Sequence, residues 1–374
     1  MAIWYYLFIF ISSVLCSTWY FLKWRKHFDV KFSLSYMLFP IVMLGYLLLA
    51  LAGDVGSAIT ANKIVYIGGC YMELLITLII YSLCHIKLPR WFITILIAIS
   101  TFTYLCVASI GYSEIYYKSV DITQRAGATI LIKEYGPMHV MFSIIIFLNF
   151  ALSLGALIYA YLKKPEASVK TILLFFLTEV FSILIFYFGR IITDRVELIP
   201  TAFVFDAVIY LIILDRLSLY EADAMVADTI FKQGNIGYIM FDFKYKYLGS
   251  TRIARKYLPE LKAARVDYKV PDEELRNKID EWIGDFLKDE VSKELHYERQ
   301  GNIFRIVVNY FYDGKRKRGY QIEVFDDTRH QQYLKTIEQY NKNLKEELAV
   351  KTALLEKLMK EKELREDTVK DEKA

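Results

Sequence analysis

The residues LIPTAFVFDAVIYLIIL (198–214) and the following DRLSLYEADAMVAD (215–228) mark the point where the chain changes character. The first run is apolar enough to lie within a bilayer, whereas the second has the charged composition of a sequence in contact with water. Long apolar segments precede this point and a charged, mixed sequence follows it. We therefore expect a membrane half and a water-exposed half, with either a substance or a signal passing across the joint.

The composition agrees with this division. Hydrophobic residues make up 55% of the 374 residues, and the excess lies before residue 215, which is typical of membrane segments rather than of a large soluble core. The cysteines all lie in apolar runs, so they predict neither a disulfide framework nor a metal site. They are Cys16, Cys70, Cys84 and Cys106. No position indicates a bound cofactor.

Seven apolar segments have about the 20 residues needed to cross the hydrocarbon core of a bilayer. They are 3–22, 33–52, 64–83, 91–111, 138–162, 169–189 and 198–214. The first segment lacks a basic leader region and a small-residue cleavage site, so we expect it to be retained as a span rather than removed as a signal peptide.

Basic residues are concentrated in alternate loops, and such loops are usually cytoplasmic. The richer set is Lys23, Arg25, Lys26, Lys31, Lys87, Arg90, Lys163, Lys164 and Lys170. The opposite loops hold Lys63, Lys118, Arg125, Lys133, Arg190 and Arg195. This distribution predicts an outside N-terminus, a seventh span that enters the cytoplasm, and a cytoplasmic C-terminal half.

The loop between the fourth and fifth spans, YSEIYYKSVDITQRAGATILIKEYGPMH (112–139), is the longest on the predicted outer side. Alternation in ATILIKEY (128–135) predicts a short strand and AGA (126–128) a turn, so a hairpin is expected over the bundle. The loop is either a simple connector or a lid that contacts a ligand.

Four ionisable residues lie within or at the edge of predicted spans, where charge is costly and usually faces a partner or a cavity. They are Glu73, Glu179, Asp206 and Arg190. Asp206 lies about two turns from the outer edge of its span, at a depth similar to that of Glu73. The four are candidates for a ligand pocket or switch, and structural hydrogen bonds between helices are the open alternative.

Two other membrane functions fit less well. A retinal protein needs a lysine within the last span, and residues 198–214 contain none. A transporter is expected to contain inverted repeats or paired broken helices, and no convincing repeat is present. A transporter with a regulatory domain stays the less favoured alternative.

The C-terminal half predicts an α+β domain over 218–328, entered through a helix at 215–232. Strands are expected at 237–241, 245–248, 293–299, 302–312 and 319–325, with DGKRKRG (313–319) as a turn. Helices are expected at 253–261 and 272–291. The order of elements resembles a PAS domain, with FDFKYKYLGST (241–251) similar to its opening hairpin and EVFDDT (323–328) to its last strand and exit.

The membrane half, residues 1–217, resembles the N-terminal seven-transmembrane sensor region of histidine kinases. Three motifs carry this resemblance: KLP (87–89), YYKSV (116–120) and KEYGPMH (133–139). The outer-loop residues of these motifs are Tyr116, Tyr117, Lys118, Tyr135, Gly136, Pro137 and His139. The resemblance implies a bacterial plasma-membrane sensor ahead of a PAS module and a cytoplasmic output, and leaves the stimulus open.

Residues 329–365 contain an unbroken heptad pattern. Its seam is Leu334, Ile337, Asn341, Leu344, Leu348, Lys351, Leu355, Leu358 and Lys362. Asn341 at a seam position favours a parallel two-stranded coil, whereas Lys351 and Lys362 weaken it. A parallel homodimer is predicted, with a single amphipathic helix as the alternative, and 366–374 is expected to be a disordered tail.

These features predict a seven-span α-helical bundle, a cytoplasmic PAS-like domain and a dimerising coiled coil. The proposed role is signal transduction from a small-molecule or membrane-derived stimulus to a cytoplasmic output protein. No phosphoacceptor, ATP-binding or metal motif is present in the sequence, so we expect neither catalysis by this chain nor nucleic-acid binding. The alternative is the sensory front of a histidine kinase, diguanylate cyclase or HD-type phosphodiesterase.

Overall fold

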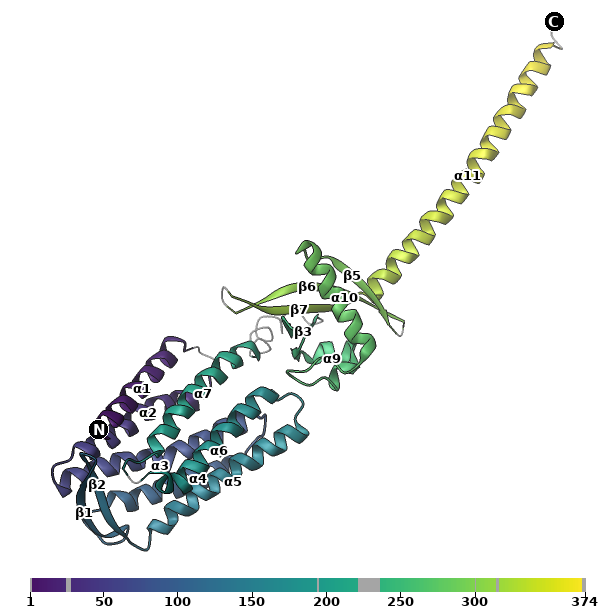
Figure 1. The fold of residues 1–374 in the computed structure, drawn as a ribbon. Helices are drawn as coiled ribbons and strands as arrows, with labels where there is room; N and C mark the ends of the chain where they lie inside the picture. The colour runs from purple at the N-terminus through teal and green to yellow at the C-terminus, as the bar shows by residue number, and fades with distance from the viewer. Residues whose placement is uncertain are drawn as a thin grey trace.

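The computed structural model describes residues 2–24, 28–193, 195–220, 236–299, 301–313 and 316–371. They form a helical bundle, an α+β domain beside one end of that bundle, and a long helix that projects from the domain (Figure 1). We call the end of the bundle next to the α+β domain the domain end. The opposite end carries a β-hairpin and is called the hairpin end.

The bundle helices run alternately between these two ends. Their bounds are α1 (Ala2–Leu22), α2 (Val30–Leu51), α3 (Val55–Leu83), α4 (Arg90–Ala108), α5 (His139–Lys163), α6 (Val169–Ile192) and α7 (Ile199–Tyr220). Helices α1 to α6 are long and apolar enough to cross a membrane. Helix α7 packs against α1, α2 and α6 but is not among those six, and it carries Asp206, Asp215 and Arg216. The membrane bundle is confirmed, and the count of seven spans stays a prediction.

Helices α2 and α3 make the closest contact in the bundle. A β-carbon added to Gly68 would lie 2.6 Å from the Val42 side chain, and one added to Gly45 would lie 2.9 Å from the Val65 backbone nitrogen. Small residues at a membrane helix interface allow the backbones to approach in this way. Helix α3 begins nine residues before the predicted start, because Asp54 and Ser57 form a capping box at its N-terminus.

The hairpin predicted between the fourth and fifth spans is present. Strands β1 (Tyr117–Arg125) and β2 (Ala128–Tyr135) pair antiparallel, and the turn uses positive φ at Ala126 and Gly127. The Thr129 hydroxyl donates to the Ala52 carbonyl at 2.7 Å, which ties the hairpin to the end of α2. The hairpin lies across the end of the bundle that is remote from the α+β domain (Figure 1).

The α+β domain has a five-stranded antiparallel sheet in the order β4-β3-β7-β6-β5. The strands are β3 (Ile236–Asp242), β4 (Tyr247–Ser250), β5 (Glu294–Arg299), β6 (Asn302–Asp313) and β7 (Arg316–Asp326). Helices α9 (Arg252–Tyr257) and α10 (Glu273–Asp289) complete it, with a 3-10 turn at Pro259–Lys262. Buried side chains from the sheet and from both helices share one apolar core.

Most of the predicted elements of this domain are confirmed, with three differences. The helix predicted at 253–261 divides at Leu258, because Pro259 restricts the preceding residue to an extended conformation. The turn predicted at 313–319 is tighter, since β6 and β7 pair as far as Asp313 and Arg316. The helix predicted at 215–232 is observed as α7 up to Tyr220, and its remainder lies outside the described residues.

Helix α11 (Thr328–Asp371) continues from the sheet and points away from the bundle (Figure 1). It extends through residues 366–371, for which the sequence predicted a disordered tail. Residues 366–371 contain neither glycine nor proline, the two strongest helix breakers. The described seam side chains are largely exposed, from Leu334 and Ile337 to Leu348 and Leu355.

Candidate functional site

A cavity with a volume of about 360 Å³ lies at the hairpin end of the bundle. Helices α1, α2, α3, α5, α6 and α7 and strand β2 all contribute to its wall. Such a volume falls within the range of small-molecule binding sites, which is about 300–1,000 Å³. Since side chains from widely separated segments converge on it, its shape depends on how these helices are arranged.

Aromatic residues and one lysine form the part of the wall nearest the hairpin. Lys133 on β2 lies with its Nζ atom 5.4 Å from the centre of the Tyr117 ring and 6.0 Å from that of Tyr66. The hydroxyl groups of Tyr66 and Tyr117 are 2.6 Å apart and hydrogen bonded. Burial acts to lower the pKa of Lys133, but the nearby Tyr117 oxygen and Glu197 outweigh it, so the pKa lies above its usual value. Lys133 therefore stays protonated at neutral pH.

The two outer-loop motifs named from the sequence meet beside this cavity. The Gly136 amide donates to the Tyr116 carbonyl at 2.8 Å, and the Met138 amide donates to the Ile115 carbonyl at 3.0 Å. A β-carbon at Gly136 would lie 2.5 Å from the carbonyl oxygens of Glu114 and Ile115, so this position requires glycine. These contacts hold the segment between β2 and α5 against the residues that precede β1.

Not every residue of these motifs faces the cavity. Tyr135 and His139 both line it, and their rings stack with centres 3.8 Å apart. Lys118 is exposed on the hairpin, with its Nζ atom 3.6 Å from Glu134. Pro137 is also exposed. Position in a motif therefore does not by itself make a residue part of the cavity.

Arg190 and Glu197 form a second charged group in the cavity wall. The guanidinium of Arg190 lies 3.8 Å from the Glu197 carboxylate. The backbone of Glu197 is held by α1, since its amide donates to the Tyr6 hydroxyl and its carbonyl accepts from Tyr5, both at 3.0 Å. The segment between α6 and α7 is therefore fixed to α1 at the edge of the cavity.

The three carboxyl groups named from the sequence are all buried within the bundle. Glu73 lines the cavity. Asp206 is not part of its lining and accepts a hydrogen bond from Ser182, which does line it, at 2.9 Å. Glu179 also lies outside the lining and interacts electrostatically with Glu73 and Asp206. The structure thus gathers these groups behind the cavity and places only Glu73 and Arg190 in its wall.

A second polar site lies at the domain end, centred on Asp267 of the α+β domain. The Asp267 carboxylate accepts from the Ser168 hydroxyl at 2.5 Å and from Arg216 at 2.9 Å. The Lys170 ammonium is 3.5 Å away, and only 4% of the Asp267 side chain is exposed. Ser168 caps α6 and Arg216 lies on α7. We call this group of four residues the Asp267 junction.

Further contacts surround the Asp267 junction. The Val266 amide donates to the Pro165 carbonyl at 3.2 Å, and the Arg265 guanidinium donates to the Tyr161 carbonyl. Asp215 at the end of α7 lies 3.2 Å from Lys23 and 3.7 Å from Arg318 on β7. Sequence reasoning missed this site, because the interacting segments are far apart in the chain and no local pattern marks Asp267.

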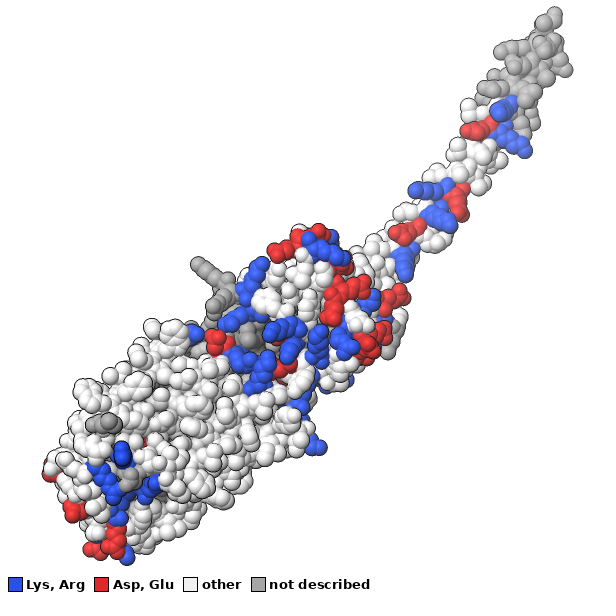
Figure 2. Space-filling view, viewed as in Figure 1, with Lys and Arg blue, Asp and Glu red and all other residues white. Residues whose placement is uncertain are grey.

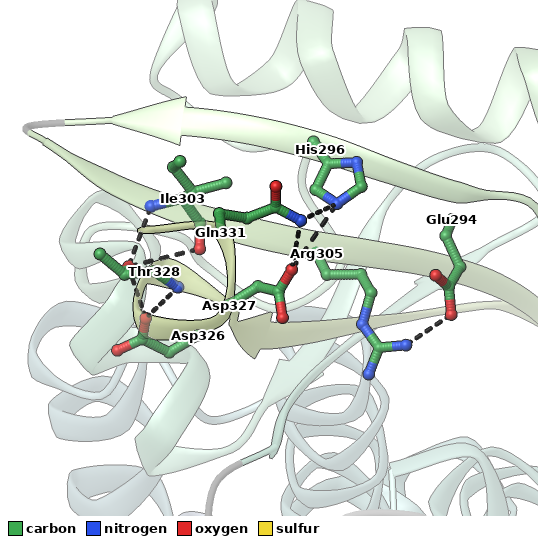
Figure 3. Close-up of polar contacts among 8 residues, drawn as sticks. All are labelled: Glu294, His296, Ile303, Arg305, Asp326, Asp327, Thr328 and Gln331. Atoms are coloured by element: carbon green, nitrogen blue, oxygen red, sulfur yellow. Dashed lines mark hydrogen bonds and ion pairs between the residues drawn. The ribbon is translucent and has the colours of Figure 1, made fainter. Parts of the chain in front are cut away.

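The start of α11 is joined to the sheet by a compact set of hydrogen bonds (Figure 3). The Thr328 hydroxyl contacts Asp326 at 2.6 Å and accepts from the Ile303 amide on β6 at 3.0 Å. Gln331, one turn into the helix, donates to Asp327 at 2.8 Å and lies 3.1 Å from the His296 ring on β5. The first turn of α11 is therefore held to β5 and β6 and to the last residue of β7.

Metal binding was not predicted from the sequence. In the ranges that the structure describes, no cluster of three or more His, Cys, Asp or Glu side chains is arranged to hold a metal ion.

Comparison with known proteins relates the chain to membrane sensors. Residues 6–222, more than half of the chain, match the family described as the N-terminal 7TM region of histidine kinase. A solved structure titled "Sensor region of a sensor histidine kinase" aligns with 12% identity over 61% of this chain and 70% of that chain. Its TM-score is 0.19, so it carries no argument about the fold. No curated protein matches the chain.

Proposed function

The chain belongs to the family of N-terminal 7TM regions of histidine kinases, and from this premise we propose that it relays a stimulus from the outer face of the bacterial plasma membrane to a cytoplasmic output. The stimulus acts at the cavity under the hairpin. The signal passes along α6 and α7 to the α+β domain and leaves through α11. The matched family is a sensory region, so the proposed role is regulatory rather than catalytic.

The distribution of basic residues supports an outside hairpin end and a cytoplasmic domain end. On the face shown in Figure 2 the side of the bundle is almost free of charge; Lys and Arg gather where the bundle meets the α+β domain, and a second group lies with acidic residues at the hairpin end. Lys23 and Lys164 lie in connections at the domain end, and Lys31 and Arg90 lie in the first turns of the helices that begin there. Basic loops favour the cytoplasmic side, and this proposal makes α7 the seventh span.

The sheet order supports a PAS-like identity for the α+β domain. In chain order the strands are arranged 2-1-5-4-3, all antiparallel, as the resemblance of 241–251 and 323–328 to PAS segments implies. Asp326 and Thr328 occupy the exit of the last strand, and their hydrogen bonds hold the first turn of α11 (Figure 3). We propose that this domain passes the position of α7 on to α11.

The single observation that carries the relay is the Asp267 junction. One buried carboxylate binds the cap of α6 and a cation on α7, so either helix must carry the α+β domain with it or break these contacts. Removing one partner of a buried ion pair is costly, about 3–5 kcal/mol when full desolvation applies. Because Arg216 and Lys170 are 22% and 44% exposed, the cost here is smaller, yet sufficient to bias a two-state coupling of a few kcal/mol.

The experiment tests whether a change at the cavity reaches α11 through this junction. Ala202 on α7 lines the cavity, and Ala202→Leu fills part of it in place of a ligand. Spin labels at Tyr333→Cys, in liposomes and in a background without native cysteines, report the spacing between two copies of α11. We expect Ala202→Leu to shift this spacing and Asp267→Asn to abolish the shift.

Asp285→Asn is the matched control, since Asp285 lies in the same domain but pairs only with Lys288 at the surface. The shift should survive in this variant. A shift that also survives Asp267→Asn would exclude the junction as the route, and an unchanged spacing in Ala202→Leu would exclude the relay itself.

A further inference from the structure

We propose that the cavity at the hairpin end binds a small amphipathic anion, with its anionic group at Lys133 and its apolar body between α5, α6 and α7. This inference names the ligand class for the proposed sensor function and rests on that function. It is argued from the charges, the walls and the opening of the cavity.

The charges in the cavity wall leave Lys133 available for an anion. Glu197 is engaged by Arg190 at 3.8 Å. Among the described residues, no carboxylate lies within ion-pair distance of Lys133, whose Nζ atom instead faces the Tyr117 and Tyr66 rings. Lys133 interacts with the Tyr117 oxygen and, beyond ion-pair distance, with Glu197, and an anionic ligand would supply the close counter-ion that neither of them provides. His139 beside Tyr135 adds a second hydrogen-bonding group on the same side.

The remainder of the cavity is suited to a hydrocarbon body. Its walls include Phe142, Ile146 and Phe150 from α5, Phe186 from α6 and Phe203 from α7. Burying apolar area against such walls contributes about 25 cal/mol per Å². The volume of about 360 Å³ corresponds to roughly twelve water volumes of 30 Å³ each. A fatty acid of about ten carbons is therefore a ligand of suitable size.

The position of the opening favours a ligand that reaches the site from the bilayer. Tyr187 on α6 lines the cavity and is 49% exposed on the side of the bundle. Ser143 on α5 also lines the cavity and is exposed. Both lie near the hairpin end of helices that contact one another. An amphiphile in the outer leaflet has its polar group at this level and its chain beside α5 and α6.

Glu73 is the feature that argues for a different ligand. Glu73 also lines the cavity, and an organic cation bound to its carboxylate would contradict the proposed anion site. The test therefore compares ligands that share one decyl chain and differ only in the head group: decanoate, decanol and decyltrimethylammonium.

Binding is measured by native mass spectrometry of the full chain in detergent, across a concentration series of each ligand. We expect decanoate to bind at least tenfold more tightly than decanol, and Lys133→Met to remove most of that difference. Lys133→Arg should retain it. Lys118→Met is the matched control, because Lys118 lies on the same hairpin, pairs with Glu134 and does not line the cavity.

Equal binding of decanoate and decanol, or an equal effect of Lys133→Met and Lys118→Met, would overturn the proposal. So would preferential binding of decyltrimethylammonium that disappears in Glu73→Gln. Failure of the relay gives a different result, since decanoate would still bind through Lys133 while the spacing of α11 stayed constant. Asp267→Asn should bind decanoate normally, because the junction lies at the opposite end of the bundle.

Discussion

Gly136 lies where the residues before β1 cross the segment that joins β2 to α5. The carbonyl oxygens of Glu114 and Ile115 lie where its side chain would be, at 2.5 Å from an added β-carbon. Both atoms belong to backbone, so neither can rotate away. The crossing positions Tyr135 and His139 in the cavity wall, and a local steric requirement thereby determines the shape of a binding site.

We predict that Gly136→Ala lowers the free energy of unfolding of the bundle by about 1–3 kcal/mol, the usual cost of forcing an extra methyl group into a packed site. Thermal unfolding of the purified protein in detergent measures this effect. Gly155→Ala is the control, because Gly155 lies within α5 and an added β-carbon there meets nothing within 4 Å. Equal unfolding temperatures for the two variants would contradict the steric explanation.

At the scale of single residues, the sequence identifies unusual side chains but does not show which of them face the cavity. The energetic cost of charge within a span singled out Glu73 and Arg190, and both line the cavity. This cost did not separate these two from Glu179, whose burial depends on how α6 is rotated against its neighbours. Lys133 was counted as a loop charge and as the first residue of the KEYGPMH motif, but not as a cavity residue, since its approach to Tyr66 depends on a contact between distant segments.

At the scale of the elements, α11 combines a regular heptad pattern with an exposed apolar seam. Leu334, Ile337 and Leu344 are each close to 38% exposed, and Leu348 and Leu355 are 61% exposed. A regular apolar seam in water favours a second helix across it. Asn341 at a seam position favours a parallel pair, and this arrangement suits two copies related by an axis normal to the membrane.

If the predicted dimer forms, Leu348→Glu should convert it into a monomer, since it places a charge on the seam of each copy. Val350→Glu is the matched control, because Val350 is 69% exposed on the same helix but lies off the seam. The mass in detergent, corrected for bound detergent, distinguishes the two states. A wild-type monomer would instead make the seam a docking face for another protein.

Elements with a regular spacing of apolar residues were predicted well, whereas the ends of elements that depend on a few local residues were not. The buried face of α10, with Leu275, Ile279 and Trp282, follows directly from its 3.6-residue period. The early start of α3 depends on Asp54 and Ser57, which lie in a polar run that resembles a loop. The β6–β7 ribbon extends into the basic residues 316–318, which resemble a turn in the sequence, yet Lys317 packs over the Tyr310 ring.

At the scale of the whole molecule, the alternating directions of the helices determine which elements lie at each end of the bundle. The hairpin and the α+β domain lie at opposite ends of the bundle (Figure 1), and in the proposed orientation a bilayer around α1 to α6 would separate them. No local pattern indicates the Asp267 junction, which forms only when the loop before α6, the end of α7 and the α+β domain are brought together.

Cysteine labelling in intact cells tests the proposed orientation. We expect a membrane-impermeant maleimide to modify Gln124→Cys on the hairpin without lysis, and to modify Glu356→Cys on α11 only after lysis. The native cysteines are buried or half-buried and should be replaced to remove background labelling. The reverse pattern would invert the topology, and labelling of both positions in intact cells would remove the membrane barrier between them.

The length of α11 has a mechanical consequence. Its 44 residues make a rod about 66 Å long at 1.5 Å per residue. A tilt of about 5° at Thr328 would then move the far tip sideways by about 6 Å, whereas a shift of α7 by that amount would disrupt its packing. In the proposed relay, the hydrogen bonds at Thr328 and Gln331 would form the pivot of α11, and their stiffness would set how far a small movement in the bundle is amplified.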